Sequence, residues 1–147
     1  PFFFFFLADA LKNMDTKGKT IGQFCCNNGR ELLSLVKSGN ASKGVGFDIA
    51  ENQVAFANEK AKELNLPCIF EAVNVYDIDD RFREQFDIVI ITIGALCWFE
   101  NLNRFFEIVD KYGEAPESIV CDYIGAMTDR FAIAQYEELF IPKSWHY

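Results

Sequence analysis

The sequence predicts an α/β fold, with a doubly wound and mostly parallel sheet and helices on both faces. Three observations predict it. Short apolar segments alternate along the chain with amphipathic segments of helical period. One apolar segment, 88–91, is a continuous run of Ile and Val, which is typical of a parallel strand covered on both faces. A turn of small residues follows the first apolar segment, and the second ends in an acid, Asp48, as at the ligand-binding edge of such a sheet.

The first half of the chain yields two helices and two strands. A helix is expected over 2–13, where apolar residues recur on one face. A strand over 20–24 follows a polar, glycine-containing breaker. The next helix, 29–37, has a leucine- and valine-rich face, and Gly39 is placed to close it. A second strand is expected over 44–48.

The second half continues the alternation. A helix over 50–64 has apolar residues at helical spacing, and Asn65 suits the left-handed position at its end. The remaining expected elements are a strand over 68–75, a polar connection over 77–84, a strand over 86–93, a helix with apolar residues at i, i+3, i+4 and i+7 from Leu102, and a strand over 118–124. Consecutive parallel strands require right-handed crossovers, so the carboxyl ends of the strands should meet at one edge.

The composition indicates a packed globular protein and argues against a nucleic-acid partner. Half of the 147 residues are hydrophobic, and 16 are Phe. The net charge is −8, whereas nucleic-acid binding depends on clustered Lys and Arg. No run of about 18 apolar residues is present, so we expect no membrane span. The apolar start lacks the basic flank and cleavage site of a signal peptide.

The cysteines indicate a reducing compartment and no metal centre. There are five, an odd number, and they lie mostly within apolar segments. No pair has the spacing of a zinc site, and the single histidine, His146, stands apart near the end of the chain. We therefore expect reduced, buried thiols, no metal and a cytoplasmic location.

The turn between the first strand and the second helix carries the strongest functional signal. Dinucleotide-binding enzymes place glycine at the positions GxGxxG, which fall here on Cys25, Asn27 and Arg30. Arg30 is unsuited to the last position, where a small residue is needed. The spacing GxGxG falls instead on Cys25, Asn27 and Gly29, and keeps the final glycine. Because NAD-binding turns have the spacing GxGxxG, the spacing GxGxG argues against NAD as the cofactor.

That spacing is one of four ordered features by which the chain resembles the class I S-adenosylmethionine-dependent methyltransferases. The four are the turn CCNNGREL, the strand end GVGFDIAENQ, the segment FEAVNVYD, and FDIVIITIGALCWF followed by a Phe-rich helix. They cover roughly 19–109. The resemblance implies a Rossmann-like fold, S-adenosylmethionine as cofactor with S-adenosylhomocysteine as product, and transfer of a methyl group.

The resemblance also implies a role for individual residues. The turn, with Gln23, Cys25, Asn27 and Gly29, would bring backbone amides against the methionine part of the cofactor, and Asp48 would accept hydrogen bonds from both ribose hydroxyls. The other implied contacts are Ile49 on the adenine face, Asn74 at the adenine amino group, Val75 at the ring through its amide, and Thr92 and Gly94 beneath the sulfonium. Catalytic residues stay unassigned, because alignment of the reactants can suffice for methyl transfer.

The domain organisation expected from this resemblance is a single domain over 1–147. Residues 1–18 form an N-terminal helix or lid, 19–110 the cofactor-binding core, and 111–147 a carboxyl-terminal part. This last part has too few residues to finish a large α/β sheet. We therefore expect segments to be missing around 112–129.

Alternatives remain open for function and for several residues. Cys25, Asn27 and Gln23 depart from the family pattern, which leaves a catalytically degenerate cofactor-binding protein as the main alternative and an NAD-dependent oxidoreductase as a lesser one. The segment Thr92–Ala95 lacks the Asn/Asp-Pro-Pro-aromatic sequence of enzymes that methylate nucleobase amines. A small-molecule acceptor is therefore favoured. Trp98 is more simply a core residue than a pocket wall, and His146 is more simply structural than catalytic.

Overall fold

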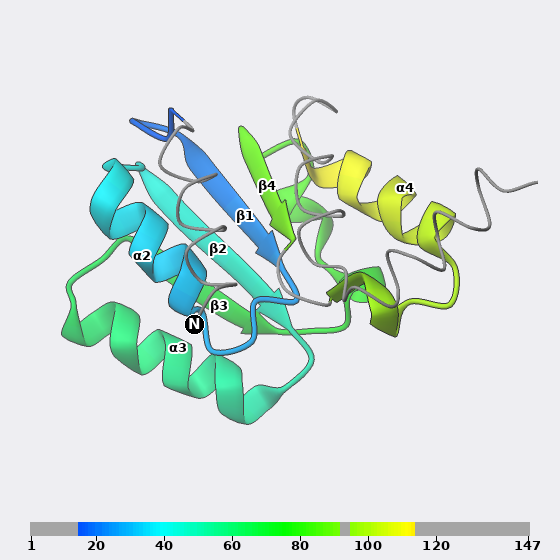
Figure 1. Cartoon of the computed structure of the whole chain (residues 1–147), viewed down its shortest axis with the longest axis horizontal. Helices are drawn as coiled ribbons and strands as arrows, with labels where there is room; N and C mark the ends of the chain where they lie inside the picture. Colours follow the sequence, from blue (N-terminus) through cyan, green and yellow to red (C-terminus); the bar gives the residue numbers. More distant parts are fainter. Residues whose placement is uncertain (1–14, 92–94, 114–147) are drawn as a thin grey trace, which may run out of the picture.

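The computed structural model describes residues 15–91 and 95–113. The described chain is built on a parallel sheet whose four strands lie in the order β3-β2-β1-β4. These strands are β1 (Thr20–Phe24), β2 (Lys43–Asp48), β3 (Cys68–Ala72) and β4 (Ile88–Ile91). The chain runs from β1 outward to β3 and then crosses back to place β4 on the other side of β1 (Figure 1). This reversal of strand order is where open α/β sheets bind their ligands.

Helices cover both faces of the sheet, as the sequence predicts. Helices α2 (Arg30–Gly39) and α3 (Glu51–Glu63) lie on one face, and α4 (Leu102–Tyr112) lies on the other (Figure 1). Alternate residues of β4 point to opposite faces, so Ile88 and Ile90 join one buried cluster and their neighbours join a second one. The expected doubly wound α/β architecture is therefore confirmed for the described residues.

The two cores differ in composition. The cluster beneath α2 and α3 is mainly aliphatic, with small residues and thiols where the helices approach the strands. The cluster beneath α4 is rich in aromatic residues. In it, Phe47 of β2 lies with its ring centroid 5.1 Å from that of Phe82 and 6.0 Å from that of Phe86. The buried hydroxyl of Tyr112 donates to the carbonyl of Ile78 at 2.6 Å, which ties the end of α4 to the connection after β3.

Element boundaries depart from the sequence prediction where polar side chains cap a turn. Strand β3 ends at Ala72, not at residue 75, because the side chain of Asn74 accepts from the Tyr76 amide and begins the 3-10 turn η1 (Val75–Asp77). The connection after it holds a second such turn, η2 (Asp80–Phe82). Strand β4 begins at Ile88, two residues later than predicted.

Helix ends were predicted with mixed success. Asn65 has the expected left-handed backbone, with φ +50° after α3. Gly39 was predicted to close α2, but it is the last helical residue, and Asn40 takes the left-handed position at φ +53°. The predicted helix over 2–13 and the predicted strand over 118–124 lie outside the described residues. Within the described ranges, no helix is both long enough and apolar enough to cross a bilayer.

Candidate functional site

The turn after β1 has a left-handed backbone at every position where the GxGxG spacing expects glycine. The φ angles are +56° at Cys25, +49° at Asn27 and +70° at Gly29. L-residues other than Asn and Asp rarely adopt this region, because Cβ approaches the backbone carbonyl. Cys25 is therefore the most strained of the three. The turn is tied to the sheet by the Cys26 amide, which donates to the Phe47 carbonyl of β2 at 3.0 Å.

Gly29 is needed for packing between the helix and the sheet. A Cβ at this position would lie 2.5 Å from the Phe70 ring of β3 and 2.9 Å from Cβ of Ala57 in α3. Gly29 is buried. Glycine at this position therefore lets the start of α2 approach β3 and α3.

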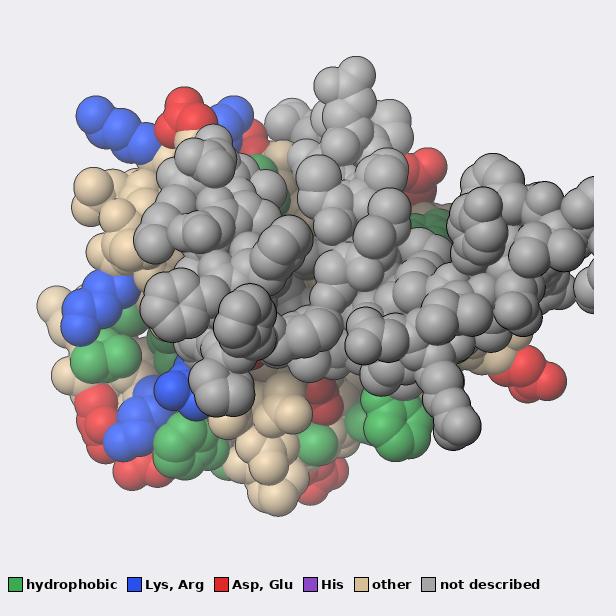
Figure 2. Space-filling view, viewed as in Figure 1, with side chains coloured by type: hydrophobic (Ala, Val, Ile, Leu, Met, Phe, Trp, Pro, Cys, Tyr) green, Lys and Arg blue, Asp and Glu red, His purple; other side chains and the backbone are tan. Residues whose placement is uncertain are grey.

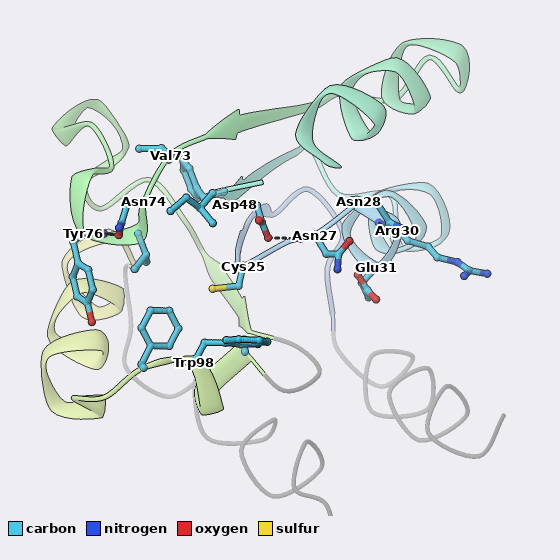
Figure 3. A pocket seen from close by; sticks show the side chains of 15 residues that line it. Cys25, Asn27, Asn28, Arg30, Glu31, Asp48, Val73, Asn74, Tyr76 and Trp98 are labelled. Atoms are coloured by element: carbon cyan, nitrogen blue, oxygen red, sulfur yellow. Dashed lines mark hydrogen bonds between the residues drawn. The ribbon is translucent and has the colours of Figure 1, made fainter. Parts of the chain in front are cut away.

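Asp48 ends β2 and links the turn to the next helix. One carboxylate oxygen accepts from the Asn27 amide at 2.7 Å, and the other accepts from the Ala50 amide at 2.9 Å, just before α3. Figure 3 shows the Asp48 side chain directed at Asn27. A carboxylate can accept about four hydrogen bonds, so two positions remain for a ligand diol. The side chain is half-buried, and its rotamer is held by both amides.

A cavity of about 670 Å³ opens at this edge of the sheet. Its described lining comes from the turn after β1, the ends of β2 and β3 with the segments that follow them, and the 3-10 turn η3 (Ala95–Trp98) with Phe99. In Figure 3, Asn74 and Tyr76 lie at one end, Asn27 and Glu31 lie at the other, and Asp48 and Cys25 lie between them. The lining therefore offers a row of different chemical groups to an elongated ligand.

Most residues expected at the site line this cavity. They are Cys25, Asn27, Asp48, Ile49, Asn74 and Val75. Ile49 is 70% exposed, so its apolar surface is available to a ligand. The Asn74 amide oxygen accepts from the Tyr76 amide at 3.0 Å and keeps a second lone pair for another partner.

Two expected residues lie elsewhere, and two are not described. Gln23 is fully buried in β1, and neither it nor Gly29 lines the cavity. Thr92 and Gly94 lie outside the described residues, as does His146.

The sequence prediction was wrong about Trp98 and missed other lining residues. Trp98 is 85% exposed at the cavity wall, not in the core. Tyr76 and Phe99 also line the cavity, and their rings meet edge to face at 6.2 Å. Glu31, in the first turn of α2, was missed as well. Its position two residues after Gly29, in the first turn of the helix, is the signal that could have found it.

The thiols near the cavity are protonated at neutral pH. Burial, with a smaller contribution from the negative charge of Asp48, raises the pKa of Cys25 to about 12. Burial also raises the pKa of Cys26 above its usual range. A protonated thiol is a poor nucleophile, so the Cys25 side chain shapes the cavity sterically. Within 15–91 and 95–113, no cluster of His, Cys, Asp or Glu is arranged to hold a metal ion.

Two family matches cover different parts of the chain. A methyltransferase domain family matches residues 21–112, which span all four strands and α4. A phosphohydrolase-associated domain family matches residues 101–138. A curated relative, a deoxyguanosinetriphosphate triphosphohydrolase-like protein of Caldanaerobacter subterraneus subsp. tengcongensis, is 35% identical over 81 residues, which is 52% of this chain and 23% of that protein.

Solved structures share the fold at low identity. A SAM dependent methyltransferase from Aquifex aeolicus has a TM-score of 0.64 at 20% identity, over 74% of this chain and 58% of that one. A putative S-adenosylmethionine dependent methyltransferase from Listeria monocytogenes has a TM-score of 0.61 at 21% identity, over 74% and 50%. A Rickettsia typhi protein solved in complex with AdoHcy has a TM-score of 0.58 at 17% identity, over 65% and 19%. The chain thus spans at most 58% of each of these structures.

Proposed function

Because the chain belongs to the methyltransferase domain family, we propose that it transfers a methyl group from S-adenosylmethionine to a small-molecule acceptor. The observation that carries the proposal is the Asp48 carboxylate at the end of β2. It lines the cavity, is fixed by two backbone amides and can accept further hydrogen bonds. A carboxylate at this place suits the two hydroxyls of a ribose.

The donor set on either side of Asp48 fits the rest of the cofactor. Ile49 offers exposed apolar surface for the flat adenine ring, and Asn74 and Val75 belong to the same lining. At the other end of the cavity from Asn74, where the Asn27 amide already donates to Asp48, the lining includes Asn27 and Asn28. The cavity volume of about 670 Å³ lies within the range of ordinary cofactor sites.

When bound, S-adenosylmethionine supplies a methyl group on a positively charged sulfur, and its loss leaves a neutral thioether. The chain's own residues then have to orient the two reactants and exclude water from the cavity. Asp48 fixes the position of the cofactor along the cavity. The rings of Trp98 and Phe99 form part of the cavity wall, and Cys25 restricts the space inside it. A proton acceptor is required only for acceptors that must lose a proton.

A small acceptor is supported by the charge of the chain and of its surface. The net charge is −8. In the space-filling view, acidic and basic side chains of described residues are interspersed around the margin of the visible face (Figure 2). A nucleic acid would instead be attracted by a continuous basic surface.

The second candidate is a protein of the same fold that holds the cofactor without turnover. It is favoured by Cys25, whose side chain occupies cavity space where glycine would leave room. An NAD-dependent oxidoreductase is a weaker third candidate, because Arg30 stands where its turn needs a small residue.

Titration calorimetry with S-adenosylmethionine, S-adenosylhomocysteine and NAD separates the three candidates. We expect both adenosyl ligands to bind and NAD not to bind. Incubation with S-adenosylmethionine and a metabolite panel should then release S-adenosylhomocysteine with at least one acceptor. Binding without release would favour the second candidate. No binding of either adenosyl ligand at millimolar concentration would rule out the proposed function.

Two further proposals concern location and domain organisation. We propose a cytoplasmic protein, which is supported by three free thiols among the described cysteines. We propose 19–110 as the cofactor-binding core, in line with the layered unit that 15–91 and 95–113 form. For 111–147 we propose two alternatives. The segment either completes the sheet or is related to the phosphohydrolase-associated domains, and the family match over 101–138 supports the second.

A further inference from the structure

We propose that Glu31, in the first turn of α2, binds the α-ammonium group of the methionine part of the cofactor. The inference rests on the proposed function and assigns a role to a residue that the resemblance leaves without one. Gln23, which the resemblance places at the methionine end, is a neutral amide, fully buried in β1 and absent from the described cavity lining. A cationic end of the ligand therefore needs its counter-charge from another residue.

Glu31 is the residue that can supply it. Two carboxylates, Asp48 and Glu31, belong to the described lining. Asp48 is engaged by two backbone amides in the middle of the cavity, at the place suited to the ribose. Glu31 is half-buried, and within the described part of the chain its carboxylate forms no salt bridge.

The position of Glu31 along the cavity matches the ligand from end to end. Figure 3 shows Glu31 beside Asn27, across the cavity from Asn74 and Tyr76. A ligand with its adenine near Asn74 and its ribose at Asp48 would point its amino-acid end toward Asn27 and Glu31. Arg30, the one basic side chain of the described lining, is exposed and extends away from this row.

Three ligands distinguish this role from the alternatives. S-adenosylmethionine carries both the ammonium and the sulfonium, S-adenosylhomocysteine carries the ammonium alone, and methylthioadenosine carries neither. Calorimetric dissociation constants of the full chain are measured for wild type, Glu31→Gln and the matched control Glu51→Gln. Glu51 is likewise an acid in the first turn of a helix, α3, but it does not line the cavity.

We expect Glu31→Gln to weaken both S-adenosylmethionine and S-adenosylhomocysteine roughly tenfold, the worth of one hydrogen bond between charged groups. Methylthioadenosine should change less than about twofold, and Glu51→Gln should change none of the three. The inference is overturned if S-adenosylhomocysteine keeps its wild-type affinity, because Glu31 then acts on the sulfonium or not at all. It is also overturned if all three ligands weaken alike, as in a general structural defect. Wild-type protein that binds none of them would refute the proposed function itself.

Discussion

Replacing Asp48 by Ala tests whether one carboxylate serves both the fold and the ligand. In the free protein its two oxygens accept from the Asn27 amide at 2.7 Å and from the Ala50 amide at 2.9 Å. The substitution removes both acceptors and, with them, the proposed grip on the ribose. Two separate losses are therefore expected, one in stability and one in affinity.

The loss of stability follows from the two backbone contacts. A hydrogen bond to a charged group contributes about 1.5–3 kcal/mol. Asn27 is exposed, so water can replace the carboxylate there, and we expect a total loss of about 2 kcal/mol in the free energy of unfolding. The loss of affinity follows from the ribose: one lost hydrogen bond to a charged group corresponds to at least about a tenfold higher dissociation constant for S-adenosylmethionine, and two to about a hundredfold.

Asp87→Ala provides the matched control at the opposite edge of the sheet. The Asp87 carboxylate accepts from the Thr20 amide at 2.7 Å and lies 3.5 Å from the Lys19 ammonium, away from the cavity. Urea denaturation measures stability, and calorimetry at a temperature where all variants are folded measures affinity. We expect both variants to lose stability, and Asp48→Ala alone to lose affinity.

Two results would refute this reasoning. Equal dissociation constants for Asp48→Ala and wild type would show that the carboxylate serves the turn and not a ribose. Equal losses of affinity in Asp48→Ala and Asp87→Ala would show that binding follows global stability. Asp48→Asn should fall between wild type and Asp48→Ala in both measurements, since its amide oxygen still accepts from one backbone amide.

Three other predictions concern the turn and the buried thiols. Cys25→Gly should raise the free energy of unfolding by up to about 1 kcal/mol, because it removes the strain of a left-handed backbone. Asn27→Gly should raise it less, because Asn tolerates this conformation better than Cys. The reverse order in urea denaturation would contradict the backbone conformations of the turn. Gly29→Ala should lower the free energy of unfolding by about 3 kcal/mol in the same assay, because the new methyl group would lie 2.5 Å from the Phe70 ring. A loss below about 1 kcal/mol would contradict the packing of Gly29 against Phe70. Burial raises the pKa of Cys68 from 9.0 to about 11, so the unfolded chain loses this proton first and stability should fall as pH rises from 9 to 11. Cys68→Ala should make that fall shallower in denaturation curves taken across the same pH range, and an unchanged slope would show that another group is responsible.

The layered sheet could be predicted because its signals are local. The apolar run of β4 and the acid at the end of β2 can each be recognised from residues that are adjacent in the sequence. The end of β3 could not be placed, because Val73 and Val75 continue a strand-like alternation while the Asn74 side chain competes for the backbone and starts a turn. Local pattern and side-chain capping favour different structures there, and capping prevails.

The site could be predicted at Asp48 and only in part elsewhere. Its carboxylate follows a strand directly, so topology alone brings it to the ligand edge. Trp98 was expected in the core because large apolar side chains are usually buried. The sequence does not show whether another element covers the side chain, and in the structure Trp98 is exposed. Glu31 resembles any solvated acid at a helix start, and its place in the lining depends on how the turn directs α2.

The order of the lining along the chain separates the cavity from the segment that the two family matches share. Every described residue that lines the cavity lies between Cys25 and Phe99, ahead of α4. The two family matches overlap on 101–112, the span of α4, and not on the cavity. Helix α4 therefore belongs to both family matches, whereas the described cavity lining lies within the methyltransferase match alone. A substitution in α4 thus changes a segment common to both families without touching a described cavity residue.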